Sequence, residues 1–192
     1  GLLADGLRYA GCHRNRRNTG GADQRVNLAV GDKAHDLAQQ NAACGAETEQ
    51  QAKKRLLKEI NSYRASIHLD SLDEVEELSA AEQELIEHFR AAGKTVLPES
   101  EGDEALDRWE SKTTDWSYCS DFGPGWGHDK DGKLIYILSA NAKVPANTPE
   151  GNAELRTTLG SSGDFNCKDC KSIGIAVVTI DGQMYWSCAV YD

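Results

Sequence analysis

The sequence predicts an α+β domain built as a three-layer αβα sandwich, with an antiparallel central sheet that ends in a C-terminal β-hairpin. The hairpin is predicted by Asp181-Gly182, which separates two β-rich runs at 172–180 and 183–192. Both faces of these runs are apolar, so both need to be covered. Amphipathic helical patterns upstream provide the two covering layers.

A two-residue type I′ turn sets the register of the hairpin, because its φ > 0 positions suit Asp and Gly. Ile180 then faces Gln183, and Ile175 faces Cys188. One face is expected to carry Ile173, Ile175, Val177, Met184, Trp186, Cys188 and Val190. The other is expected to carry Ala176, Val178, Ile180, Tyr185, Ala189 and Tyr191.

The length of 192 residues suits a single domain over 1–192 with a sizeable core. The net charge of −10, from 31 acidic and 21 basic residues, argues against nucleic acid or an anionic membrane surface as partner. No run approaches the roughly 20 apolar residues of a transmembrane helix. The start at Gly1 without Met favours a mature or trimmed chain, compatible with a removed signal peptide and a removed anchor signal.

The first part of the chain is rich in Gly and Arg. Residues 1–25 are predicted to be extended or loop-like. Arg16 and Arg17 resemble a dibasic processing site, although a solvated basic loop explains them more simply. Residues 26–43 fit a helix that is broken or kinked near Gly31.

Two helices are expected in the acidic middle of the chain. The first covers about 48–65. The segment Ser71-Leu-Asp-Glu74 reads as a capping box that opens the longest helix, about 72–92. Gly93 is expected to end that helix as a left-handed cap.

The next segment alternates turns, helices and one strand. Residues 100–103 are expected to form an acidic turn before a helix whose inner face includes Trp109. Residues 116–132, rich in Gly and aromatic residues, are expected to form an ordered loop, and 134–138 a strand. A last helix is expected from Thr148 as cap to about Gly160.

Six cysteines in an even, scattered set predict three disulfides and an oxidising compartment. Fifteen connectivities are open, although a bond between Cys170 and Cys188 is disfavoured by their separation along the hairpin. A redox role for Cys167-Lys-Asp-Cys170, or a zinc site that adds Cys188, is an alternative. The pair precedes a strand rather than opening a helix, which favours structural disulfides. The candidates are Cys12, Cys44, Cys119, Cys167, Cys170 and Cys188.

Two further patterns have a structural explanation and a functional one. Three acidic residues suggest calcium, but the spacing of an EF-hand loop is missing, and a β-turn at 129–132 fits better. The three are Asp121, Asp129 and Asp131. Four aromatic residues fit either a sugar or peptide groove or the packing of a Gly-rich loop, and packing is favoured. These are Trp116, Tyr118, Phe122 and Trp126.

From about Arg55 to its end the chain resembles the CAP superfamily of cysteine-rich secretory, antigen 5 and pathogenesis-related proteins. Leu57-Lys-Glu-Ile-Asn-Ser-Tyr-Arg64 resembles the opening helix motif of that family, and Ala105-Leu-Asp-Arg-Trp109 its Trp-bearing helix. The run from Ile173-Gly-Ile to Cys188-Ala-Val-Tyr191 resembles its ending. The resemblance implies the αβα fold.

The metal-binding tetrad of CAP proteins, two His and two Glu, is mostly missing. Lys112 stands at the position of one Glu, and Gly93-Lys94-Thr95 lacks the other. The segment 154–158 lacks His, and His128 precedes a turn rather than a helix. His88 alone remains, and zinc needs three or four ligands. We therefore expect no catalytic residue, no metal and no cofactor.

The chain resembles the surface antigen (SAG) family of Eimeria-type coccidian parasites in three features: its cysteine count, its acidic helical middle and its missing CAP tetrad. This resemblance implies a non-enzymatic antigen on the cell surface, attached to the membrane by a GPI anchor outside this chain. Its implied partners are the host cell surface or host antibodies. The alternatives are a secreted CAP-like metal-dependent hydrolase and a lipid- or sterol-binding protein; the oligomeric state stays open.

Overall fold

The computed structural model describes residues 46–192. The helices are α2 (Glu49–Ser66), α3 (Glu76–Ala92), α4 (Glu99–Thr113) and α5 (Pro149–Ser162), with a 3-10 turn η1 at Ala140–Ala142. The strands are β1 (Asp73–Glu74), β2 (Val96–Pro98), β3 (Tyr118–Phe122), β4 (Pro124–His128), β5 (Leu134–Leu138), β6 (Ser172–Ile180) and β7 (Gln183–Tyr191). The prediction of an α+β protein is confirmed.

The terminal hairpin has the predicted register. Ile180 pairs with Gln183, and Ile175 pairs with Cys188. Asp181 and Gly182 have φ values of 49° and 78°, as a type I′ turn requires. Nine residues of each strand are paired without a break, so this hairpin is the longest continuous ladder in the described part of the chain.

Two sheets are present within residues 46–192. The first has the order β1-β6-β7-β3, and the second has the order β2-β5-β4. All pairings are antiparallel except that of β1, which runs parallel to β6. The central sheet is therefore antiparallel as expected except at this edge.

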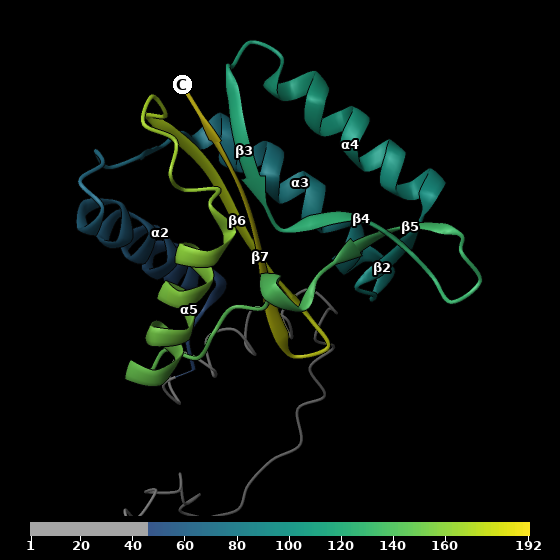
Figure 1. Ribbon diagram of the computed structural model, residues 1–192. Coiled ribbons are helices and arrows are strands. Elements are labelled where there is room, and N and C mark those ends of the chain that lie inside the picture. The colour runs from purple at the N-terminus through teal and green to yellow at the C-terminus, as the bar shows by residue number, and fades with distance from the viewer. Residues whose placement is uncertain (1–45) are drawn as a thin grey trace, which may run out of the picture. The chain divides into compact units, whose positions relative to one another are not determined.

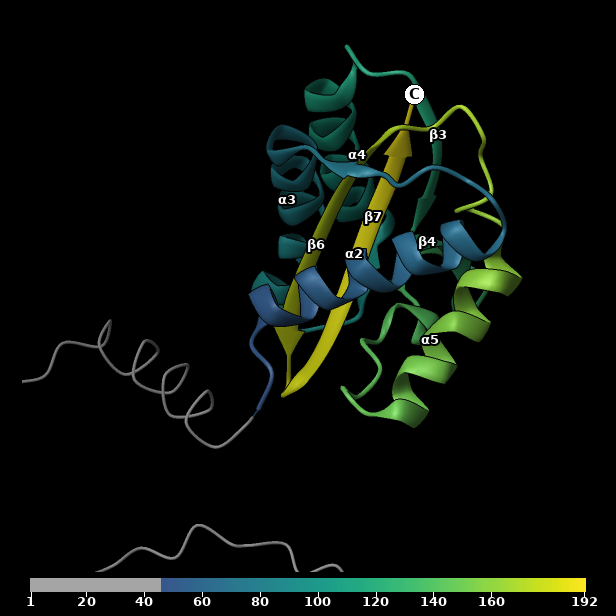
Figure 2. The same cartoon turned by 90° about the vertical axis from the view of Figure 1, so that its left-hand side faces the viewer.

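Helices cover both faces of the hairpin (Figures 1 and 2). One face packs with α2 and α5 in a core that includes Leu56, Leu155 and Trp186. The opposite face packs with α3 and α4 in a core that includes Phe89 and Ala105. The residues divide between the faces as the register predicted, because neighbouring strand residues point to opposite sides.

Two glycines allow helices to approach the sheets closely. A Cβ atom on Gly174 of β6 would lie 2.6 Å from the carbonyl carbon and oxygen of Leu78 in α3. A Cβ atom on Gly102 of α4 would lie 2.5 Å from the Cβ of Tyr136 in β5. Both contacts are shorter than ordinary carbon contacts, so each helix reaches its observed position only because glycine is present.

The capping box predicted at Ser71 to Glu74 is wrong. The residue preceding α3 is Val75, and its side chain forms no capping bond. The segment pairs with β6 instead: the amide of Asp73 donates to Lys171 O at 2.8 Å, and the amide of Val75 donates to Ile173 O at 3.0 Å. Backbone bonds to a neighbouring strand thus take the place of the local cap.

The loop predicted over 116–132 is also wrong, because it contains β3 and β4. β3 pairs with β7, and β4 pairs with β5, so distant strands impose an extended backbone on a segment with little local β pattern. The turn predicted at 100–103 is the first turn of α4. A three-residue strand, β2, was not predicted.

Several helix ends match the predictions. Gly93 caps α3 with φ 62°, and the Thr148 side chain accepts a bond from the Gly151 amide at the start of α5. α5 continues to Ser162, slightly past the predicted end, and Gly163 caps it. The loop predicted at 1–25, the helix predicted at 26–43, and Cys12, Arg16, Arg17 and Cys44 lie outside the described residues.

Candidate functional site

The positions that correspond to the CAP tetrad are spread over different parts of the fold. His88 lies on α3 and Lys112 on α4, on one side of the central sheet. The segment 154–158 belongs to α5, which packs on the other side. Lys94 and Thr95 line a separate hollow of about 540 Å³ beside the hairpin turn. These segments do not meet in one pocket.

Both acidic and cationic side chains lie around His88. It lines a hollow of about 200 Å³ together with Glu84, Glu87 and Arg108. The Nζ of Lys112 donates to Oε2 of Glu84, and Nη1 of Arg108 lies 3.8 Å from Oε1 of the same carboxylate. The hydrogen bond from Lys112 lowers the pKa of Glu84. Glu84 is therefore paired with two cations, and Glu87, the other acidic residue of this hollow, is paired with Arg90.

Glu82 forms a buried polar junction between three elements. Its Oε1 accepts a hydrogen bond from Trp109 Nε1 of α4 at 2.6 Å, and its Oε2 accepts one from Ser187 Oγ of β7 at 2.5 Å. Burial raises the pKa of Glu82 to about 7, which the two hydrogen bonds oppose. Glu82 and Ser187 are each only 1% exposed, so no substrate reaches this pair. The junction joins α3 to α4 and β7 rather than activating a nucleophile.

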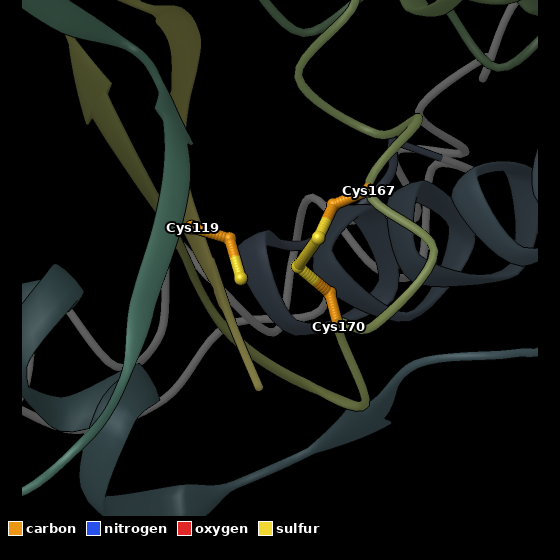
Figure 3. Close-up of side chains that lie close together, drawn as sticks. All are labelled: Cys119, Cys167 and Cys170. Carbon is orange, nitrogen blue, oxygen red and sulfur yellow. A yellow bond between two sulfur atoms is a disulfide. The ribbon is translucent and has the colours of Figure 1, made fainter.

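Three cysteines gather where β3 meets the loop before β6. Cys167 and Cys170 form a disulfide with their Cα atoms 5.6 Å apart. The Cys119 sulfur lies within 4.8 Å of both, and its side chain points toward the bond (Figure 3). Among residues 46–192 this is the one group of three or more His, Cys, Asp or Glu residues close enough to share a metal ion.

Arg64, at the C-terminal end of α2, anchors the loop that carries this disulfide. Its guanidinium is completely buried and donates to four backbone carbonyls. Nη1 bonds Phe165 O at 2.8 Å and Cys167 O at 3.0 Å. Nη2 bonds Cys170 O at 3.3 Å, and Nε bonds Asp70 O at 2.7 Å. Desolvation lowers the pKa of Arg64, and the carbonyls compensate for its lost hydration.

Of the three predicted disulfides, the structure shows one within residues 46–192, between Cys167 and Cys170. Cys119 and Cys188 have no disulfide partner within residues 46–192, and Cys188 is buried in the core that also contains residues of α2 and α5. Cys188 does not join Cys167 and Cys170, as the alternative zinc site required. Whether all six cysteines are oxidised stays a prediction, because Cys12 and Cys44 lie outside the described residues.

The four aromatic residues pack on different partners rather than lining one groove, although Trp116 and Tyr118 share Tyr191. Phe122 lies 4.4 Å from Trp186, Trp126 lies 4.9 Å from Tyr136, and Trp116 lies 6.3 Å from Tyr191, between ring centroids. Tyr118, although 51% exposed, contacts Trp109 and Tyr191 and donates to Asp121. These contacts agree with the packing explanation.

The Asp129 turn forms as predicted. Its Oδ1 accepts from the amides of Asp131 and Lys133, each at 2.9 Å, and Gly132 has φ 77°. The Asp129 carboxylate therefore holds a turn of its own backbone, which agrees with the structural explanation of these acidic residues.

Sequence reasoning missed Glu82 as a buried residue and the approach of Cys119 to the C-x-x-C pair. A signal for Glu82 was present, since it falls on the helical stripe of Leu78, Leu85 and Phe89. A charged residue on such a stripe indicates a buried partner. No local pattern connects Cys119 to residues nearly fifty positions later.

Comparison with the models of known protein families gives no match for this chain, and comparison with curated proteins gives none either. Within residues 46–192, no helix combines the length and the apolar character needed to cross a membrane.

Proposed function

We propose that the protein is a non-enzymatic surface antigen of CAP-like αβα architecture, displayed on a coccidian parasite through a GPI anchor. Its partners on this proposal are the host cell surface and host antibodies. The observation that carries the proposal is the pair of helical layers on the terminal hairpin, since a hairpin buried on both faces is what the resemblance implies.

The surroundings of His88 do not favour a zinc site, which supports the non-enzymatic part of the proposal. A catalytic zinc site needs three protein ligands and an open position. Beside His88, Glu84 is instead paired with Lys112 and Arg108. Glu87 is paired with Arg90, so both carboxylates of this hollow already have cationic partners. The other tetrad segments lie at the hairpin turn and on the opposite helical layer.

A zinc titration tests the non-enzymatic part. Calorimetry on the unreduced full chain at moderate salt should show only weak, salt-sensitive binding to the acidic surface, equal in wild type and His88→Ala. A stoichiometric micromolar site that disappears in His88→Ala would instead support the alternative, a metal-dependent CAP-like hydrolase or binder.

The display part is tested on intact parasite cells. Antibody staining without permeabilisation should detect the protein at the surface. A phospholipase that cleaves glycosylphosphatidylinositol should release it into the medium, and the inactive enzyme should not. Staining that requires permeabilisation would refute surface display, and surface staining that resists the phospholipase would refute the lipid anchor.

A further inference from the structure

We propose that Cys119, Cys167 and Cys170 form a thiol–disulfide exchange site, in which the C-x-x-C disulfide moves onto Cys119. The proposal concerns the chemistry of this cluster and does not depend on the proposed function. Its starting point is the Cys119 sulfur, which has no disulfide partner within residues 46–192 and lies within 4.8 Å of both sulfurs of the Cys167–Cys170 disulfide (Figure 3).

The local backbone of β3 directs Cys119 toward the disulfide. Tyr118 pairs with Tyr191 and Ser120 pairs with Val190, so Cys119 is the extra residue of a β-bulge. A bulge changes the direction of a side chain without disturbing the rest of the ladder, and bulges occur often beside functional sites. Cys170 belongs to the core on the α2 and α5 side of the sheet, and Cys119 and Cys167 both pack against that core.

The guanidinium of Arg64 holds the backbone of the loop that carries the disulfide. Three of the four carbonyls that its guanidinium bonds belong to Phe165, Cys167 and Cys170. Phe165 is completely buried and stacks on Trp186 at 6.3 Å between ring centroids. These contacts hold the backbone of the loop in place, so the three sulfurs stay within 4.8 Å of one another.

The exchange is balanced without an external oxidant. The Cys119 thiol loses its proton to water, and its thiolate attacks the Cys170 sulfur. The Cys119–Cys170 bond forms as the Cys167–Cys170 bond breaks, and Cys167 leaves with the electron pair and takes a proton from water. Attack at Cys170 is favoured because the departing Cys167 is half-buried and reaches water, whereas Cys170 is only 1% exposed.

The two bonds differ in the chain that they enclose. Cys167 and Cys170 are three positions apart, whereas Cys119 and Cys170 are separated by about fifty positions. A disulfide that closes a longer loop removes more freedom from the unfolded chain. The exchanged form thus ties β3 to the start of β6, and it turns Cys167 into an accessible thiol.

Burial and nearby charges set the fraction of Cys119 that is present as thiolate. Burial, Asp192 and Asp169 raise the pKa of its thiol, whereas the Arg64 cation opposes them. At neutral pH most molecules therefore carry the thiol rather than the attacking thiolate. Below the thiol pKa, each unit of added pH should raise the thiolate fraction about tenfold.

Disulfide mapping tests the proposal, because Lys168 lies between the two cysteines. The unreduced full chain is held at pH 8, its free thiols are alkylated under acid quench, and it is digested with trypsin. Trypsin separates the peptides 113–130, 157–168 and 169–171, each with one cysteine of the cluster. We expect 169–171 linked to 157–168 in some molecules and to 113–130 in others, with Cys167 alkylated in the second group.

Two variants make the result specific. Cys119→Ser should remove the second linkage and reduce alkylation of Cys167 to background, while the circular dichroism spectrum stays that of the folded protein. Cys188→Ala removes the other described free thiol, and it should leave both linkages unchanged.

Three results would overturn the proposal. The first is 169–171 linked only to 157–168 with Cys119 always alkylated. The second is Cys119 linked only to a peptide that carries Cys12 or Cys44. The third is a trio of unoxidised cysteines with one zinc ion bound, which native mass spectrometry would detect.

Discussion

Glu82 is the residue whose ionisation should most affect stability. Burial raises its pKa from 4.5 to about 7, so the folded protein holds this proton more tightly than the unfolded chain. The resulting stabilisation is complete below about pH 4.5 and disappears as pH rises through about 7. Its size is on the order of 3 kcal/mol.

Glu82→Gln should remove this pH dependence. The amide oxygen of Gln can still accept from Trp109, and its NH₂ can donate to Ser187 Oγ without a charge to desolvate. In urea unfolding, the variant should match wild type near pH 5 and exceed it at pH 8. The control is Glu77→Gln on the exposed side of the same helix, which should follow wild type. Parallel pH profiles for wild type and Glu82→Gln would contradict the assignment.

Arg64 is the other residue on which a buried network depends. Arg64→Lys keeps the charge but loses the planar fork that serves four carbonyls. We expect the free energy of unfolding to fall by about 3 kcal/mol, because hydrogen bonds from charged donors are lost in the interior.

A matched control for Arg64 is available on the surface. Arg156 has a side chain that is 61% exposed and bonds Glu59 at 2.9 Å. Arg156→Lys should change the free energy of unfolding by less than about 1 kcal/mol in the same denaturation experiment. If the free energy of unfolding fell equally in Arg64→Lys and Arg156→Lys, the hydrogen bonds from Arg64 to the buried carbonyls would add no more stability than a surface ion pair.

At the scale of elements, the contact between α3 and β6 depends on Gly174. Gly174→Ala places a methyl group 2.6 Å from the Leu78 carbonyl, so the helix and the strand must separate. We expect a loss of about 1–3 kcal/mol by thermal or urea denaturation. Gly125→Ala in β4 is the control, because no atom lies within 4 Å of its added Cβ. A neutral Gly174→Ala would show that α3 can move away from β6 at no cost.

At the scale of the whole molecule, the two helical layers make neighbouring hairpin residues equally intolerant of charge. Val177 and Val178 point to opposite faces and are 3% and 0% exposed. Val177→Asp and Val178→Asp should each abolish folding, because either carboxylate would be buried without a partner.

The control for this pair is the same substitution at an exposed strand position. Val96 of β2 is 41% exposed, and Val96→Asp should leave the near-ultraviolet circular dichroism spectrum and the unfolding transition close to those of wild type. If one of the two hairpin variants folds, the corresponding face is open to solvent and the layered arrangement is incorrect.

The sequence by itself determined the terminal hairpin and the helix caps at Gly93 and Thr148. Each depends on neighbouring residues, since a two-residue turn sets its own register and a cap acts within one helical turn. The sequence also determined which hairpin residues face each layer, because side chains alternate along a strand.

Only the tertiary structure decided where distant segments meet. Asp73 and Glu74 have the local pattern of a cap, yet they form a strand because they pair with Ser172 and Ile173 of β6. β3 is extended because β7 pairs with it. The meeting of Cys119 with the C-x-x-C pair, and that of Glu82 with Ser187, join residues far apart in sequence. Such contacts form only when the helices and strands pack together, and a pattern of neighbouring residues does not contain that information.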